Sequence, residues 1–248
     1  MRRLRKDPAR FLSDAGLDPD PWQADILRSS AARFLLNITR QGGKSLVAAA
    51  MVLKTAFFIE NALVLLLSPT HRQSGELFKA KVLKLYNDLG RPVPSARPRD
   101  NATMLELQNG SRVISLPGDE ETVRGYSAVN LLVVDEASLV TDTLYRAVRP
   151  MLAVSKGKIM ALSTPHGKRG WFFEEWRRQS GWEYKQVRAS ECPRIGADFL
   201  EEERIAIGDV WFSQEYETEF VDTITSLFRQ SDIEATLNPT LAPVDLGM

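Results

Sequence analysis

The chain has 248 residues, 44% hydrophobic and 26% charged, and its 32 basic and 32 acidic side chains cancel to zero net charge. This composition is ordinary for a globular protein, and the charge balance argues against indiscriminate polyanion binding by the whole surface. Apolar runs such as residues 62–67 are far too short to cross a bilayer, and the single cysteine, Cys192, excludes an internal disulfide. A single cysteine fits a reducing cytoplasm. The basic residues 1–6 are not followed by an apolar stretch, so they do not predict a secretory signal. The length favours a single α/β domain.

Charge is unevenly distributed along the chain. Residues 71–99 carry seven Lys or Arg against two acids, a net charge of +5, whereas residues 191–222 carry two against ten, a net charge of −8. Both segments can be solvated helix faces. Alternatively, the first forms a positive face for nucleic acid and the second an acidic lobe directed elsewhere.

The first clear element is a helix that begins near residue 21. Asp20 is a typical N-cap residue, and Pro21 suits the first turn of a helix. Trp22 and Gln23 follow, and an aromatic ring beside an amide can stack on adenine while the amide bonds its edge. A core tryptophan beside a surface glutamine explains the same pair equally well.

Residues 38–45 join a strand-like run at 34–37 to a helical run at 46–58. Strand, glycine-bearing turn and helix is the context that a phosphate-binding loop requires. Gly42 and Gly43 let backbone N–H groups turn toward a phosphate, because a Cβ at either position would crowd it. The N-terminus of the following helix favours the same anion.

Two side chains of this loop predict the chemistry. Lys44 can reach the β- and γ-phosphates, and the Ser45 hydroxyl can bind Mg²⁺. The full pattern has glycine where this chain has Ile38. The tripeptide Gly-Lys-Ser alone therefore also fits an ordinary strand-to-helix turn.

The next elements extend the predicted sheet. Residues 63–67 form a second buried strand, and residues 77–86 follow as a helix with one apolar and one basic face. The Asn-Gly pair at residues 109–110 predicts a hairpin between strands at 103–107 and 112–116.

Residues 131–134 are all apolar and predict a parallel strand covered on both faces. Asp135 and Glu136 follow at its C-terminal end, where open α/β sheets bind their ligands. Asp135 can hold Mg²⁺, and Glu136 can orient and deprotonate an attacking water. A strand ending in two exposed acids is the alternative, but pairing with Lys44 and Ser45 favours the catalytic interpretation.

A further strand at residues 158–162 ends in the polar run 163–167. A hydroxyl here can sense the γ-phosphate and relay its loss, although a plain polar turn explains the spacing equally well. An aromatic helix from residue 170 and a strand at 184–188 follow. Two amphipathic helices, at 199–205 and 211–220, then suggest a small helical lid.

These elements predict one domain over residues 1–225, with a core at about 22–190 and a lid at about 191–225. Residues 226–248 have the composition of a tail or linker.

Taken together, residues 22–222 resemble the ATPase domain of the large terminase subunit of tailed double-stranded DNA phages. The order and spacing of several motifs carry this resemblance, which is more specific than any one of them. In that family, a residue other than glycine at position 38 is normal. The motifs are Trp22-Gln23, Arg40 to Ser45, Ser68-Pro69-Thr70, Arg124-Gly125, Val133 to Glu136, Ser163 to Gly167, and Gln214-Glu215-Tyr216 with Glu219-Phe220.

The resemblance implies a RecA-like P-loop NTPase fold: a mostly parallel sheet flanked by helices, with an extra strand between those that bear the loop and the carboxylates. It implies ATP and Mg²⁺ as cofactors. The implied catalytic residues are Glu136, Arg124 and Lys44; the nucleotide-binding residues are Trp22, Gln23, Arg40, Gln41, Gly42, Gly43, Lys44 and Ser45; the metal ligands are Ser45 and Asp135; and the coupling residues are Ser163, Thr164 and Pro165.

The resemblance implies a role at the nucleotide site for each of two arginines, Arg124 and Arg40. Arg124 would act in trans as an arginine finger, whose removal typically costs roughly 10³–10⁵ in turnover. A surface salt bridge is the structural alternative for Arg124. Arg40 would contact phosphate in its own subunit or position Glu136.

The implied partners are double-stranded DNA, the portal protein of the procapsid, the small terminase subunit and further copies of the chain in a ring of about five. The implied setting is the host cytoplasm, without a membrane. Large terminases usually continue into a nuclease domain, and only about 25 residues follow the predicted lid, too few for a domain. We therefore expect ATPase and motor activity from this chain and no DNA cleavage.

Two other classes fit part of the pattern. A single-domain DNA-dependent ATPase related to superfamily helicases shares the loop and the acid pair, although a helicase needs a second RecA-like domain. A nucleotide-binding module without hydrolysis needs Lys44 and has no use for Glu136. The basic segments at 71–99 and 168–188 are the candidate DNA contacts, and they should read phosphates without sequence preference.

Overall fold

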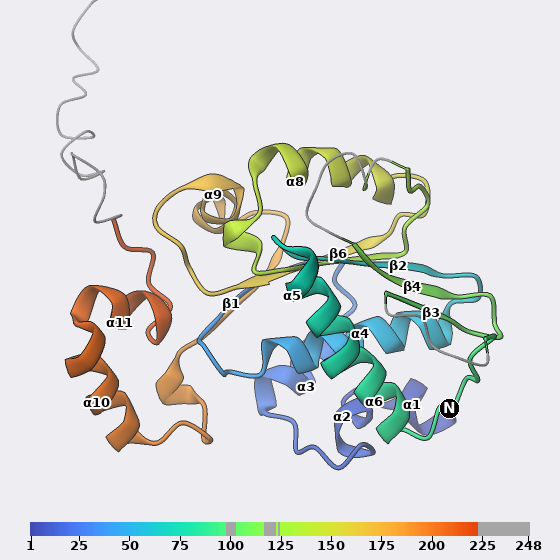
Figure 1. The fold of residues 1–248 in the computed structure, drawn as a ribbon, viewed down its shortest axis with the longest axis horizontal. Helices are drawn as coiled ribbons and strands as arrows, with labels where there is room; N and C mark the ends of the chain where they lie inside the picture. Colours follow the sequence, from blue (N-terminus) through green and yellow to red (C-terminus); the bar gives the residue numbers. More distant parts are fainter. Residues whose placement is uncertain (98–102, 117–122, 124, 223–248) are drawn as a thin grey trace, which may run out of the picture.

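The computed structural model describes residues 1–97, 103–116, 123 and 125–222. These residues form a seven-stranded sheet in the order β3-β4-β2-β5-β6-β1-β7, with helices on both faces (Figure 1). Neighbouring strands are parallel except β3 and β4, which pair antiparallel as the hairpin predicted around Asn-Gly. The strands are β1 (Arg33–Ile38), β2 (Leu63–Leu67), β3 (Met104–Glu106), β4 (Arg112–Leu116), β5 (Leu131–Asp135), β6 (Lys158–Ser163) and β7 (Glu183–Val187).

Both faces of the central strands are buried, as their continuous apolar runs predict. Along β5, Leu131 and Val133 pack into one hydrophobic core, and Leu132 and Val134 pack into the other. Alternation follows from the two-residue period of a strand, which sends successive side chains to opposite faces. A parallel sheet needs such cover on both faces.

The first core lies between the sheet and the N-terminal helices. Its central element is α4, whose alanine-rich sequence allows close approach to the strands and buries most of its surface. A π-helical turn lies between α5 and α6, so these three elements form one continuous helical stretch. The elements of this layer are α1 (Arg2–Lys6), α2 (Arg10–Ser13), α3 (Pro21–Arg28), α4 (Lys44–Phe58), α5 (His71–Glu76), η1 (Leu77–Leu83) and α6 (Lys84–Asp88).

The second core lies beneath α8 and α9, on the opposite face of the sheet (Figure 1). Beyond β7, α10 and α11 pack together at one side of the sheet, broken at Gly208 as predicted. The elements are η2 (Ala137–Leu139), α8 (Asp142–Val148), η3 (Arg149–Leu152), α9 (Gly170–Arg178), η4 (Ala189–Glu191), α10 (Ala197–Ile207) and α11 (Asp209–Glu215).

The sheet order confirms the predicted fold. Strand β6 lies between β1, which precedes the glycine loop, and β5, which carries the acid pair. This is the extra-strand arrangement of the RecA-like class. Within the described residues, no helix is both long and apolar enough to cross a bilayer.

One helix prediction was wrong. The second C-terminal helix ends at Glu215 instead of reaching residue 220. Thr218 adopts a left-handed conformation with φ of 57°, which turns the chain back toward the sheet. Phe220 then packs against the rings of Phe173 and Trp176 on α9, so its apolar side chain is partly buried against that helix and does not extend α11. Arg124 and residues 226–248, for which we predicted an arginine finger and a tail, lie outside the described residues.

Candidate nucleotide-binding site

Three predicted motifs meet at one edge of the sheet. The glycine loop follows β1, the acid pair ends β5, and the polar run 163–167 ends β6. The three strands are parallel neighbours, so their C-terminal ends lie at the same edge. This is where open α/β sheets bind ligands.

The loop has the backbone conformation expected of an anion-binding turn. Gly43 caps α4 in the left-handed region with φ of 91°, where a side chain would be strained. A Cβ on Gly43 would also lie 2.5 Å from Nε2 of Gln23, and one on Gly42 would lie 2.8 Å from the side chain of Ile38. The two glycines are therefore required by the fold of the loop itself.

Lys44 and Glu136 face each other across this edge. Lys44 Nζ lies 3.0 Å from Glu136 Oε1, and the two side chains are 13% and 25% exposed. Glu136 adopts φ of 50° and ψ of 47°, a left-handed conformation that costs a non-glycine residue free energy and is enriched at functional sites. The strained backbone turns this carboxylate out of the strand direction beside the lysine.

Asp135 is the most deeply buried charge-bearing group at this edge. The residue is 7% exposed, and Oδ1 has no hydrogen-bond partner among the described residues. Burial, followed by repulsion from Glu136, raises the pKa of Asp135 to about 6. A buried, unpaired carboxylate oxygen beside the first turn of α4, which carries Ser45, is the donor set that Mg²⁺ prefers, so the residues fit the metal.

The polar run after β6 is joined to the segment that follows Glu136. Ser163 Oγ lies 2.7 Å from Ser138 Oγ and accepts a hydrogen bond from Ser138 N at 3.2 Å. Thr164 and Pro165 line the same cavity as Lys44 and Glu136. The end of β6 is therefore hydrogen-bonded to the segment that follows Glu136.

The cavity at this edge has a volume of about 440 Å³, within the usual size range of small-molecule sites. Helix α11 closes one side of it. Glu215 pairs with Arg40 Nε at 2.7 Å, and its carbonyl accepts from Arg40 N and Thr39 Oγ1. Gln214 Oε1 accepts from Gly167 N at 3.1 Å. Helix α11 therefore contacts both the glycine loop and the run after β6.

Arg194, a residue that the sequence did not single out, braces the loop from outside through Asp20. Arg194 forms a two-pronged ion pair with Asp20, at 2.7 Å to each carboxylate oxygen. The same guanidinium lies 3.4 Å from the carbonyl oxygen of Gly42. Because 174 residues separate the ion-pair partners, no local sequence signal could have found them.

The structure places Trp22 and Gln23 behind the loop. Trp22 is 5% exposed and belongs to the first core. Gln23 accepts from Asp20 N at 2.9 Å in the predicted helix cap, and its amide nitrogen donates to the carbonyl of Gly43 at 3.3 Å. Neither residue lines the cavity. Adenine recognition by this pair stays a prediction.

With this geometry established, we compared the chain with known proteins. No family model matches it. The chain is 26% identical over 268 residues to the large terminase subunits of Thermus phage G20c and Thermus virus P23-45. The alignment covers 94% of this chain and 55% of each relative, so the chain spans about half the length of the curated relatives it matches.

Solved structures agree on the fold. The large terminase ATPase domain of Thermus phage P74-26 superposes with a TM-score of 0.71 at 23% identity, covering 86% of this chain and 98% of that one. The large terminase of another thermophilic bacteriophage, in complex with ADP, superposes with a TM-score of 0.63 at 14% identity, covering 87% and 53%. These matches confirm the resemblance to large terminase subunits and the RecA-like architecture.

Proposed function

We propose that this chain hydrolyses ATP at the edge formed by β1, β5 and β6 and uses it to move double-stranded DNA into a viral procapsid. The carrying observation is the pairing of Lys44, the first residue of α4, with Glu136, which directly follows β5; their charged atoms lie 3.0 Å apart. Similarity to large terminase subunits of two Thermus viruses supports the packaging role. Mg²⁺ and ATP are the proposed cofactors, and one structural relative, a large terminase, was solved with ADP.

Lys44 and Glu136 divide the chemistry. In the structure the ammonium and the carboxylate neutralise one another. A triphosphate in the loop carries more charge than one carboxylate, so Lys44 transfers its N–H donors to the β- and γ-phosphates. Glu136 is then free to orient a water and accept its proton, the role of a general base.

Asp135 and Ser45 are the proposed metal ligands. When bound, Mg²⁺ neutralises charge on the phosphate oxygens. Asp135 would hold the metal through its unpaired Oδ1, and Ser45, in the first turn of α4, would hold it through its hydroxyl. Arg40 lines the same cavity, held by Glu215, and adds a second basic side chain to it beside that of Lys44.

Coupling to movement uses Ser163 and the C-terminal helices. Loss of the γ-phosphate releases the Glu136 turn, which is hydrogen-bonded through Ser138 to Ser163. Helix α11 contacts the loop through Glu215 and the run after β6 through Gln214, so it responds to both. In this proposal α10 and α11 form the lid of the motor.

Assembly and DNA contact complete the proposal. Copies of the chain form a ring in which Arg124 reaches the site of a neighbour, and the ring works with the portal protein and the small terminase subunit. For DNA, Arg72, Lys79 and Lys81 are exposed on α5 and η1 and form no ion pair within the described residues. Such lysines and arginines suit phosphate contacts that are sensitive to salt and independent of sequence.

The test is steady-state ATP turnover with and without double-stranded DNA, repeated with procapsids that carry their portal. We expect turnover to rise with DNA of any sequence and procapsids to protect DNA from added nuclease. Turnover per chain should also increase with protein concentration, because Arg124 acts between subunits. Single-stranded DNA of equal length is the matched control.

Each alternative gives a different outcome. Strand separation of a forked duplex without procapsid protection would favour the helicase-related ATPase. Nucleotide binding without turnover under every condition would contradict the motor and leave a binding module.

A further inference from the structure

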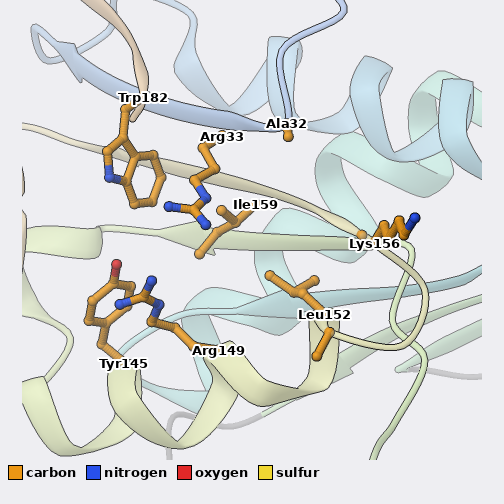
Figure 2. A pocket seen from close by; sticks show the side chains of 10 residues that line it. Ala32, Arg33, Tyr145, Arg149, Leu152, Lys156, Ile159 and Trp182 are labelled. Atoms are coloured by element: carbon orange, nitrogen blue, oxygen red, sulfur yellow. The ribbon is translucent and has the colours of Figure 1, made fainter. Parts of the chain in front are cut away.

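A second cavity lies at the opposite edge of the sheet, where strands β1 and β6 begin. Its volume is about 390 Å³. Figure 2 shows Arg33, from the first residue of β1, and Arg149, from η3, directing their guanidinium groups into the same space. The rings of Trp182 and Tyr145 stand beside the two guanidiniums, and Lys156 points away from them.

The two guanidiniums have no counter-ion within hydrogen-bonding distance among the described residues. Neither Arg33 nor Arg149 forms an ion pair with any carboxylate in the described part of the chain, although Arg149 lies 5.5 Å from the ring centroid of Tyr145. Both arginines are exposed and line the same cavity, so an anion from solvent has access to the two guanidiniums. The planar guanidinium fork matches phosphate oxygens better than a lysine ammonium does.

The carboxylate beside the two rings is already engaged. Glu175 accepts a hydrogen bond from Trp182 Nε1 at 3.0 Å and from the Tyr145 hydroxyl at 3.3 Å. It therefore fixes both rings, and its ion pair is with Arg178, at 3.9 Å; among the described residues it forms none with Arg33 or Arg149. Burial and the charge of Glu175 raise the pKa of Tyr145 to about 12, so this wall does not gain a phenolate.

The remaining walls are rigid and apolar. Tyr145 stacks on Trp171 with ring centroids 3.9 Å apart and an angle of 8° between the planes. Leu152 and Ile159 line the same cavity as the two arginines. An apolar floor beside a partly exposed indole suits the flat face of a nucleobase.

We propose that this cavity is a second, non-catalytic site for the phosphate of a nucleotide, with Arg33 and Arg149 holding the phosphate and Trp182 contacting the base. The nucleotide is either free or the terminal residue of a nucleic-acid strand, since both present a phosphate beside an aromatic base. The site is separate from the Lys44 edge and does not rest on the ATPase proposal.

The test uses two probes, AMP and a 5′-phosphorylated single-stranded oligonucleotide, with binding measured by titration calorimetry. AMP lacks the β- and γ-phosphates that Lys44 is placed to reach. We expect Arg33→Ala and Arg149→Ala each to weaken binding by about tenfold, because each removes charge-assisted hydrogen bonds. Arg112→Ala is the matched control, since this exposed arginine begins β4 at the same sheet edge outside the cavity.

Further variants secure the interpretation. Lys44→Ala should leave AMP binding at the second cavity unchanged. Loss of AMP binding in this variant would place AMP at the Lys44 edge of the sheet and overturn the proposal. Combining Arg33→Ala with Arg149→Ala gives a double variant that should not bind either probe. If that variant is unstable, Arg33→Lys with Arg149→Lys keeps the charge and removes the guanidinium forks, and it should still bind more weakly than the parent chain. If AMP binds and its binding depends on the two arginines, the ligand is a free nucleotide. If only the oligonucleotide binds in this way, the ligand is the end of a nucleic-acid strand. The proposal is overturned if the parent chain binds neither probe. It is also overturned if both double variants bind the probes as tightly as the parent chain does.

Discussion

Replacing Glu136 with glutamine should abolish ATP hydrolysis and retain ATP binding. The amide keeps the shape of the side chain and cannot accept a proton from water, so turnover should fall by roughly 10²–10⁴. The same substitution removes the counter-ion that lies 3.0 Å from Lys44 before ATP binds. ATP affinity should therefore be unchanged or higher, because Lys44 no longer has to leave a carboxylate.

Single-turnover hydrolysis and equilibrium ATP binding, measured on the same preparation, separate the two effects. Glu60→Gln is the matched control, since this exposed glutamate follows the C-terminal end of α4, away from the cavity, and should behave like the parent. Undiminished turnover in Glu136→Gln would exclude the general-base role. A large loss of ATP affinity would instead mean that Glu136 holds the loop together.

Replacing Asp135 with asparagine should stabilise the chain in the absence of metal and remove Mg²⁺-dependent turnover. The carboxyl has a pKa of about 6 in the fold, above its ordinary value of 3.8. The folded chain therefore binds more protons than the unfolded chain between these values, and stability falls as the pH rises through that window. Above pH 6 the full penalty applies, on the order of 2–3 kcal/mol.

The measurement is the free energy of unfolding from denaturant titrations at pH 4 and pH 7. At pH 7 we expect Asp135→Asn to be more stable than the parent, with the difference shrinking toward pH 4. Asp25→Asn, at an exposed position on α3, is the control and should show little change. A less stable Asp135→Asn chain at pH 7, or one with full Mg²⁺-dependent turnover, would refute the account of this carboxylate.

The strands could be predicted because their signals are local. Leu63–Leu67 and the run that ends in Asp135 are continuous apolar stretches bounded by polar residues, and their predicted limits agree with the structure to within a residue. The meeting of Lys44 with Glu136 also followed from the sequence, since residues after parallel strands share one sheet edge.

Other features depend on contacts that no local pattern encodes. The end of α11 at Glu215 is set by Phe220, whose ring packs on α9 instead of continuing the helix. Arg194 braces the loop through Asp20, a partner far away in the chain. The second cavity joins Arg33 and Arg149 from distant segments, and neither residue belongs to a recognisable motif.

The most direct test of the central claim is a structure of the chain with Mg²⁺ and a non-hydrolysable ATP analogue. The account predicts that the triphosphate lies in the loop of residues 39–43, with Lys44 Nζ bonded to phosphate oxygens instead of Glu136 Oε1. Glu136 should face the γ-phosphate across a water. An analogue bound elsewhere, with the Lys44–Glu136 pair intact, would contradict it.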